Sequence, residues 1–183
     1  MQIIGKDFSP IAFAAYVAGL DLGNKAAWAK FVVLHNTGAP TLAQRPNGLT
    51  YQHILNLESY YSNTMHWSAG PHCFVDDNGI WVFSPLTAPG VHSFNWNPCS
   101  FGVEQLGDYD TEAYDSGRGL LVQQNAIACV AVLSHACGID SGSMRLHKEN
   151  KTTTHKDCPG TACADHKARF ISDVHDYIVT HLN

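Results

Sequence analysis

The chain has 183 residues, of which 45% are hydrophobic and 15% charged, and its net charge at pH 7 is −5. This length and composition are typical of one folded domain, which we expect to span residues 1–183. Because the chain is acidic and has no run of lysine or arginine, neither nucleic acid nor an anionic membrane surface is expected as its partner. No segment is expected to cross a membrane, since a spanning helix needs about 20 apolar residues.

The first predicted element is a helix over about residues 8–22, interpreted as an N-terminal extension of the domain. Ser9 and Pro10 are typical of a helix N-cap followed by proline in the first turn. The apolar run over residues 10–20 also resembles the core of a signal peptide. Asp7 and Asp21 flank that run directly, which favours a helix of the mature fold.

The next segments alternate between strand and helix. Residues 31–34 (FVVL) predict a buried strand that delivers His35 at its carboxyl end. Residues 48–63 are predicted to be helical. Two apolar runs, residues 70–75 and 80–83, flank an Asn-Gly pair, and this pattern predicts a β-hairpin.

The second half of the chain predicts two further strands and two helices. The strands cover residues 101–106, which include Glu104, and residues 144–146. The helices cover residues 120–136 and 164–182, and Gly138 is a suitable cap for the first of them. Strands in the middle with helices around them predict an α/β fold with a central mixed sheet flanked by helices.

Six cysteines permit disulfide bonds, but a chain of this size does not require them. Cys129 and Cys137 lie in an apolar helical stretch, where buried free thiols are usual. A reducing compartment is therefore expected for synthesis.

Three residues that follow predicted strands or loops offer the donors of a catalytic zinc site. His35, His147 and Cys158 supply two imidazole nitrogens and one thiolate, and such a site needs three protein ligands and one open position. Taken singly, a histidine at a strand end is more often structural, and Glu104 in a strand is more often a solvent-facing residue. Together, the donors and this carboxylate indicate a zinc hydrolase.

Four stretches in order give the chain a specific resemblance: residues 32–35 (VVLH), 72–79 (HCFVDDNG), 100–104 (SFGVE) and 147–160 (HKENKTTTHKDCPG). The chain resembles the zinc-dependent N-acetylmuramoyl-L-alanine amidases of the peptidoglycan-recognition-protein and phage lysozyme-type family. The resemblance covers about residues 28–180 and implies the corresponding fold.

The resemblance implies a role for each matching residue. His35, His147 and Cys158 match the zinc ligands, Lys156 matches an oxyanion-stabilising position, and Glu104 matches the catalytic base. His155 is a rival to His147, because the segment between His147 and Cys158 is longer than in many members of the family.

Other matching positions concern the substrate groove. His72 and His92 match groove residues, and Trp67 is a candidate for stacking on sugar, although aromatic residues more often pack in the core. Pro71 stands where some members place a catalytic tyrosine. Those members lack the strand glutamate. Because this chain has proline in place of the tyrosine and has the glutamate, Glu104 is expected to act as the catalytic base.

The resemblance implies hydrolysis of the amide bond between N-acetylmuramic acid and L-alanine in bacterial peptidoglycan, with Zn²⁺ as cofactor. A phage-type endolysin that acts as a monomer is the leading interpretation, made in the cytoplasm without a clear signal peptide and acting on the cell wall after release. A muropeptide-recycling amidase, an interbacterial toxin and a non-catalytic peptidoglycan-binding module are the alternatives.

Overall fold

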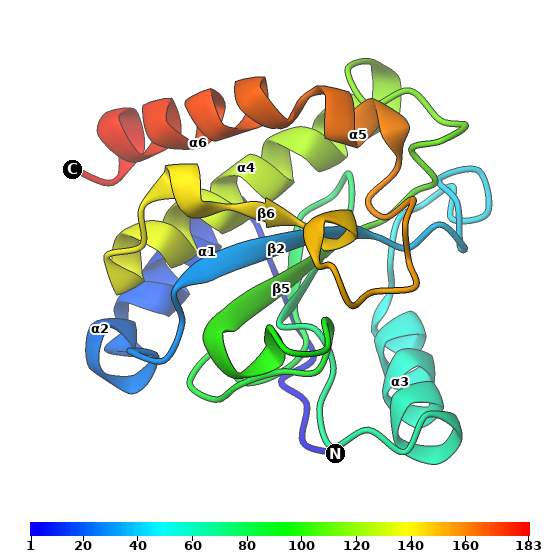
Figure 1. Ribbon diagram of the computed structural model, residues 1–183, viewed down its shortest axis with the longest axis horizontal. Helices are drawn as coiled ribbons and strands as arrows, with labels where there is room; N and C mark the ends of the chain where they lie inside the picture. The colour runs from blue at the N-terminus through cyan, green and yellow to red at the C-terminus, as the bar shows by residue number, and fades with distance from the viewer.

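Six strands form one mixed sheet in the computed structural model, which describes residues 1–183 (Figure 1). Their bounds are β1 Lys6–Phe8, β2 Phe31–Asn36, β3 Cys73–Val75, β4 Ile80–Val82, β5 Ser100–Gln105 and β6 Arg145–Leu146. Their order across the sheet is β1-β4-β3-β5-β2-β6. The strands β3, β5, β2 and β6 run parallel, whereas β4 pairs antiparallel with both β3 and β1. The expected α/β fold with a mixed sheet is confirmed.

The predicted strands and hairpin are confirmed, and one further strand is present. β3 and β4 are joined through Asn78-Gly79, as the Asn-Gly signal indicates. Strand β1 was not predicted, because three residues with two exposed side chains give no readable alternation of polarity. It precedes the N-terminal helix and pairs with β4, so the extension begins as part of the sheet.

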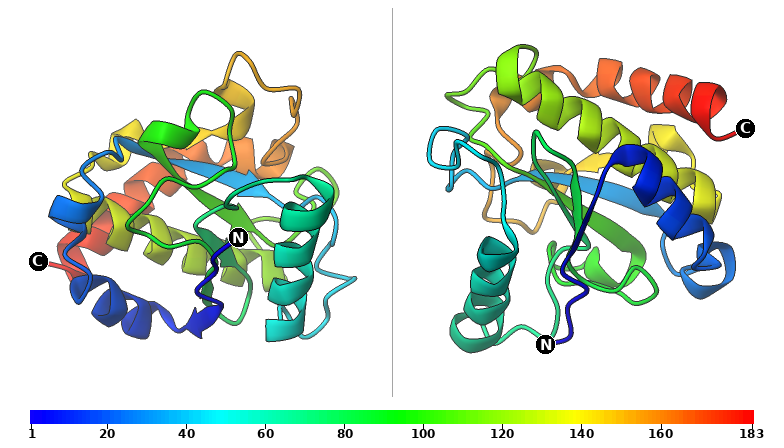
Figure 2. Two further views of the ribbon diagram at one scale, coloured as in Figure 1. Left: turned by 90° about the horizontal axis from the view of Figure 1, so that it is seen from below. Right: turned by 180° about the vertical axis from the view of Figure 1, so that it is seen from behind.

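The helices lie on both sides of this sheet. Their bounds are α1 Pro10–Ala18, α2 Leu22–Lys25, α3 Tyr51–Ser59, α4 Gly117–Cys137, α5 Thr161–Asp165 and α6 Lys167–His181. Helix α4 packs on β2, β3, β4 and β5, and α1 and α6 pack against α4. Figures 1 and 2 show these three helices gathered on one side, whereas α3 stands apart on the other. The helices α1, α4 and α6 therefore lie on one side of the sheet and α3 on the other.

The sequence was expected to hold no segment long and apolar enough to cross a membrane, and helix α4 shows that this expectation was wrong. Its 21 residues are long and apolar enough, by length and composition, to cross one. In the structure, 61% of its apolar window is buried inside the protein. The composition of α4 is that of a helix enclosed in the core on most of its surface.

Two predicted helices are interrupted in the structure. The helix expected over residues 48–63 consists of α3, capped by the Thr50 side chain, and a π-helical turn, Tyr60–Thr64. The helix expected over residues 164–182 begins earlier, at Thr161, and is divided at His166 into α5 and α6. Both breaks occur in polar stretches. The spacing of apolar residues, which predicts a helix, does not show there that the helix ends or changes its pitch.

Candidate active site

An open cleft of about 720 Å³ lies on the side of the sheet that α4 leaves free. Its floor includes the carboxyl ends of β2 and β5, and one wall is α3 with the following π-helical turn. The parallel register of β2 and β5 places His35 beside Glu104. Because neighbouring residues in register point to the same face of a sheet, both side chains enter the cleft.

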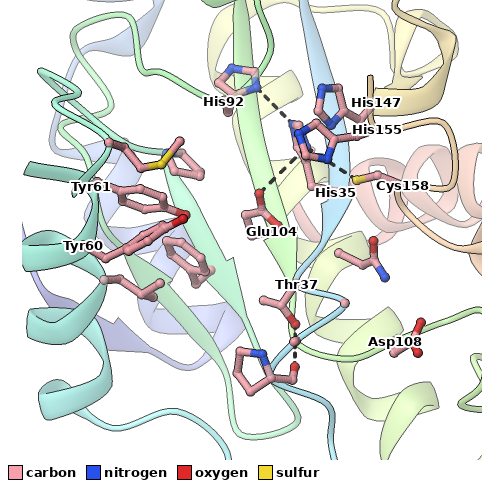
Figure 3. Close-up of a pocket in the computed structure, with 18 of the residues that line it drawn as sticks. His35, Thr37, Tyr60, Tyr61, His92, Glu104, Asp108, His147, His155 and Cys158 are labelled. Atoms are coloured by element: carbon pink, nitrogen blue, oxygen red, sulfur yellow. Dashed lines mark hydrogen bonds and ion pairs between the residues drawn. The ribbon is translucent and has the colours of Figure 1, made fainter. Parts of the chain in front are cut away.

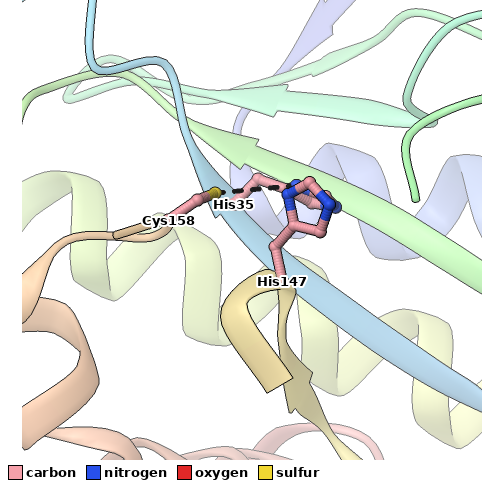
Figure 4. Close-up of side chains that lie close together, drawn as sticks. All are labelled: His35, His147 and Cys158. Atoms are coloured by element: carbon pink, nitrogen blue, oxygen red, sulfur yellow. Dashed lines mark hydrogen bonds between the residues drawn. The ribbon is translucent and has the colours of Figure 1, made fainter. Parts of the chain in front are cut away.

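Three potential metal ligands converge at one end of the cleft (Figure 4). One ligand atom of each of His35, His147 and Cys158 lies within 4.8 Å of the others, and His35 Nδ1 lies 3.8 Å from the Cys158 sulfur. A tetrahedral zinc ion with bonds of about 2.0–2.3 Å holds its ligand atoms roughly 3.5 Å apart. The donor types and their spacing therefore fit zinc after small side-chain adjustments.

Different segments deliver these three ligands, and backbone contacts hold the segments together. His35 belongs to β2, which pairs with β6, and His147 follows β6 directly. The N–H of Lys148 donates to the carbonyl oxygen of Cys158 at 2.9 Å. This hydrogen bond joins the turn that carries His147 to the loop that carries Cys158.

A second histidine fixes the orientation of the His35 ring. His35 Nε2 lies 3.1 Å from His92 Nδ1, and His92 Nε2 lies 3.2 Å from the carbonyl oxygen of Ser100. A carbonyl oxygen only accepts, so His92 donates from Nε2 and its Nδ1 accepts from His35. His35 Nδ1 therefore keeps its lone pair, and this is the nitrogen that faces Cys158 and Glu104.

Burial keeps the histidines of the site neutral. It lowers the pKa of His147 to about 4 and that of His92 to about 3, and it lowers the pKa of His35 well below its ordinary value. Neighbouring histidines add to each of these shifts. Neutral imidazole is the form that binds metal, so the nitrogen donors are ready at neutral pH.

The structure places His147, and not His155, beside His35 and Cys158. His147 is 7% exposed, and its Nε2 lies 3.0 Å from Thr153 Oγ1. His155 is exposed and stacks on His147, with their ring centroids 5.4 Å apart.

Glu104 lies between the potential ligands and the opposite wall of the cleft (Figure 3). Its carboxyl oxygen is 3.8 Å from His35 Nδ1, and its side chain is 15% exposed. Burial raises the pKa of this carboxyl to about 8. A carboxyl group with such a pKa beside three potential metal ligands is suited to accept and return a proton.

The remaining predicted residues divide between the cleft and the core. Lys156 is exposed on the cleft wall, and Trp67 lines it, stacked on Tyr61 with a centroid distance of 5.0 Å. His92 also lines the cleft, but both of its ring nitrogens are engaged.

His72 does not fit its expected role as a groove residue. Its side chain has no exposed surface and does not line the cleft. Its Nδ1 accepts from the N–H of Gly102 at 3.0 Å, and its Nε2 lies 3.1 Å from the carbonyl oxygen of Ala88. The ring joins β5 to the loop before β5, which is a structural role.

Sequence reasoning missed several residues of the cleft wall. Tyr61 lies across the cleft from Glu104 (Figure 3), and His53 and Arg45 line the wall near the N-terminus of α3. The sequence of α3 contains a stripe of polar and aromatic residues that could have indicated a binding surface. This stripe does not show on which side of the sheet α3 lies.

Comparison with known proteins identifies the family. Residues 24–161 match the model of the N-acetylmuramoyl-L-alanine amidase family, and the chain belongs to this family. Peptidoglycan-recognition protein SC2 of Drosophila simulans is 25% identical over 142 residues, which cover 74% of this chain and 71% of that protein. The matched range begins after α1, so β1 and α1 lie outside it.

Solved structures share the fold. Wild-type PGRP-LB of Drosophila has a TM-score of 0.62 with 18% identity, covering 76% of this chain and 80% of that one. The endolysin amidase LysCS of Clostridium intestinale has a TM-score of 0.59 with 23% identity, covering 77% and 82%. The chain thus has the fold shared by peptidoglycan-recognition proteins and endolysin amidases.

Proposed function

We propose that this protein is a zinc-dependent amidase that cleaves the bond between N-acetylmuramic acid and L-alanine in peptidoglycan. The observation that carries the proposal is the convergence of two neutral histidines and a cysteine beside Glu104, in a cleft open to a large substrate. Membership of the amidase family supports the choice of bond.

His35, His147 and Cys158 would hold the metal. When bound, zinc would lower the pKa of a water molecule toward 7 and, as a positive charge, favour the ionised form of Glu104. Because the free Nδ1 of His35 is fixed by its link to His92, the site is organised before a metal arrives.

Glu104 would carry the proton during the reaction. Its carboxylate takes the proton of the attacking water and then delivers it to the leaving amine of L-alanine. A buried carboxyl group suits this exchange, because its raised pKa favours holding the proton between the two steps.

Lys156 would stabilise charge on the carbonyl oxygen of the scissile amide. It lies two residues before Cys158 on the cleft wall, and no acidic side chain pairs with it. An ammonium group in that place can meet the developing oxyanion.

We further propose that the protein acts on the cell wall as an endolysin. The likeness to an endolysin amidase supports this setting. A complex of a PGRP-LB variant with tracheal cytotoxin is among the similar structures, and it supports a peptidoglycan fragment as the ligand of this cleft.

Mass analysis of the products from purified peptidoglycan tests the reaction. We expect new L-alanine N-termini, no new reducing sugar ends, and loss of both product and activity with a chelator. New reducing ends without free amines would identify a glycosidase and overturn the proposal. Lysis of outer-membrane-permeabilised cells by added protein tests the endolysin role separately.

A further inference from the structure

The side chain of Thr153 is buried beside the potential ligand His147. Its Oγ1 lies 3.0 Å from His147 Nε2, and it accepts a hydrogen bond from the backbone N–H of His155 at 3.1 Å. Thr153 belongs to residues 148–157, a segment that is longer than in many members of the family. Within this segment, only Lys156 has a part in the proposed reaction.

The hydroxyl of Thr153 limits which nitrogen of His147 can bind a metal. A neutral imidazole carries one N–H and one lone pair. With Nε2 engaged by Thr153, the nitrogen left for a metal is Nδ1. Thr153 Oγ1 has two lone pairs, and because one of them accepts from His155, the other can accept from Nε2–H of His147. That arrangement leaves the lone pair of Nδ1 free.

The same arrangement occurs at His35. Its Nε2 is engaged by His92, and its Nδ1 faces Cys158. Both histidines would thus be held by Nε2 and would offer Nδ1. A metal-binding histidine usually donates its other ring N–H to an acceptor that sets the tautomer and the orientation of the ring. His92 fills this role for His35, and Thr153 is placed to fill it for His147.

The turn that begins at His147 holds Thr153 in place. The N–H of Asn150 donates to the carbonyl oxygen of His147, and the N–H of Thr153 donates to the carbonyl oxygen of Asn150, both at 3.0 Å. These two hydrogen bonds, each between residues three apart, bring Thr153 back to the ring of His147. The hydroxyl is therefore in position before a metal binds, which reduces the entropy lost on binding.

Asn150 joins this turn to the loop that carries His92. Its buried side-chain amide donates from Nδ2 to Ser93 Oγ at 2.9 Å and to the carbonyl oxygen of Phe94 at 2.6 Å. Its Oδ1 accepts from the N–H and from the hydroxyl of Thr152. Every donor and acceptor of this amide group therefore has a partner. Because Ser93 follows His92 directly, Asn150 links the supports of both histidine ligands.

We propose that Thr153 is a positioning residue, which accepts from Nε2–H of His147 and so directs Nδ1 of that ring to the metal. Asn150 keeps this support in place relative to His92. The inference rests on the proposed zinc site, because a metal is what the two rings would be positioned for. The segment 148–157 would therefore contribute to metal affinity as well as to the wall of the cleft.

Zinc affinity, measured by competition with a zinc-binding dye, tests the role of Thr153. Thr153→Val keeps the shape of the side chain but removes the hydroxyl, and we expect it to bind zinc roughly 10- to 100-fold more weakly than the wild type. Thr153→Ser restores the acceptor and should recover most of this affinity. Thr154→Val, at the exposed neighbouring position, is the matched control and should bind zinc as the wild type does.

Nuclear magnetic resonance gives a readout that a purely structural role of Thr153 would not change. Long-range proton–nitrogen correlation spectra of the zinc-loaded wild type, with isotope-labelled histidine, should show zinc on Nδ1 of His147 and a slowly exchanging proton on its Nε2. In Thr153→Val this proton should exchange faster with solvent. Zinc on Nε2 of His147 in the wild type would overturn the inference, and this measurement decides if Thr153→Val does not fold.

Asn150→Ala loosens both supports and should weaken zinc binding at least as much as Thr153→Val does. Wild-type zinc affinity in either variant would also overturn the inference. Digestion of peptidoglycan by the same preparations separates this inference from the proposed function. A wild type that binds zinc through Nδ1 of His147 but cleaves no peptidoglycan would refute the amidase and leave the role of Thr153 intact. A wild type that binds no zinc would refute the metal site, and this inference with it.

Discussion

Two pairs of buried histidines lie close together in this protein, and they differ in what their nitrogens face. His35 and His147 direct ring nitrogens toward a thiol, whereas His72 and His92 use theirs on backbone groups and on His35. Burial lowers the pKa in all four. Burial and neutrality therefore do not distinguish a ligand from a structural residue. The potential ligands differ from the structural histidines because one ring nitrogen of each converges with the sulfur of Cys158.

Removing a ligand should have the largest effect. We expect His147→Ala and Cys158→Ser to lose bound zinc and all measurable hydrolysis, because three ligands are the minimum for such a site. His155→Ala, the matched control on the neighbouring exposed ring, should keep both. Metal analysis after dialysis measures the first effect. If His155→Ala alone lost zinc, the assignment of His147 would be wrong.

The sequence predicted the donors because their chemistry is distinctive and because strand ends are readable. The FVVL run indicated the strand that carries His35, although β2 continues beyond the predicted end at Leu34 to Asn36. The register of β2 against β5, which brings Glu104 to His35, is a long-range pairing that no local pattern encodes.

Other parts of the site could not be predicted for a related reason. The residues around His72 and His92 do not show that His92 lines the cleft while His72 is enclosed in the core; tertiary contacts decide this. Arg45 lies in a polar loop whose path depends on the contacts of Arg118 with its carbonyl oxygens. Side-chain contacts between segments far apart in the chain determined these positions.

Replacing the base should have the next largest effect. Glu104→Gln keeps the shape of the side chain but cannot accept a proton, so zinc should be retained while turnover falls about 10²-fold or more. The carboxyl must be ionised to act, so wild-type activity should fall as pH falls through its pKa. Bound zinc would lower this pKa below the metal-free value of about 8. Near-normal turnover with an unchanged acidic limb in the variant would show that Glu104 is not the base.

Lys156 tests whether an exposed residue near the ligands contributes to catalysis. Lys156→Ala should lower kcat about 10²-fold with little change in KM, since the ammonium would act on the transition state. Its side chain is exposed, so the melting temperature should not change. The neighbouring Lys151→Ala is a matched exposed control. Equal kcat for the two variants would mean that Lys156 is only solvated.

His92 links the two histidine pairs, and its replacement should weaken metal binding without abolishing it. His92→Leu removes the acceptor that orients His35, and loss of such a partner typically costs about 10- to 100-fold in metal affinity. His92→Gln supplies an acceptor again and should recover part of that affinity. A competition titration with a zinc-binding dye measures both. Equal affinities for wild type and His92→Leu would show that His35 needs no orientation.

The smallest expected effect is that of replacing His72, and it changes how the free energy of unfolding depends on pH. Its folded-state pKa is about 4, lowered mainly by burial, against an ordinary value of 6.5. Between these values the unfolded chain binds a proton that the folded protein does not, so the free energy of unfolding falls as pH falls from about 6.5 to 4. The full loss from this one group is about 3 kcal/mol.

His72→Gln should be less stable at pH 7, because it loses packing, but its stability should depend on pH less steeply over this range. Urea unfolding of both proteins with a chelator present removes the contribution of metal release. Equal slopes for the two proteins would mean that His72 binds its proton as readily in the folded protein as in the unfolded chain, and the lowering of its pKa by burial would have to be abandoned.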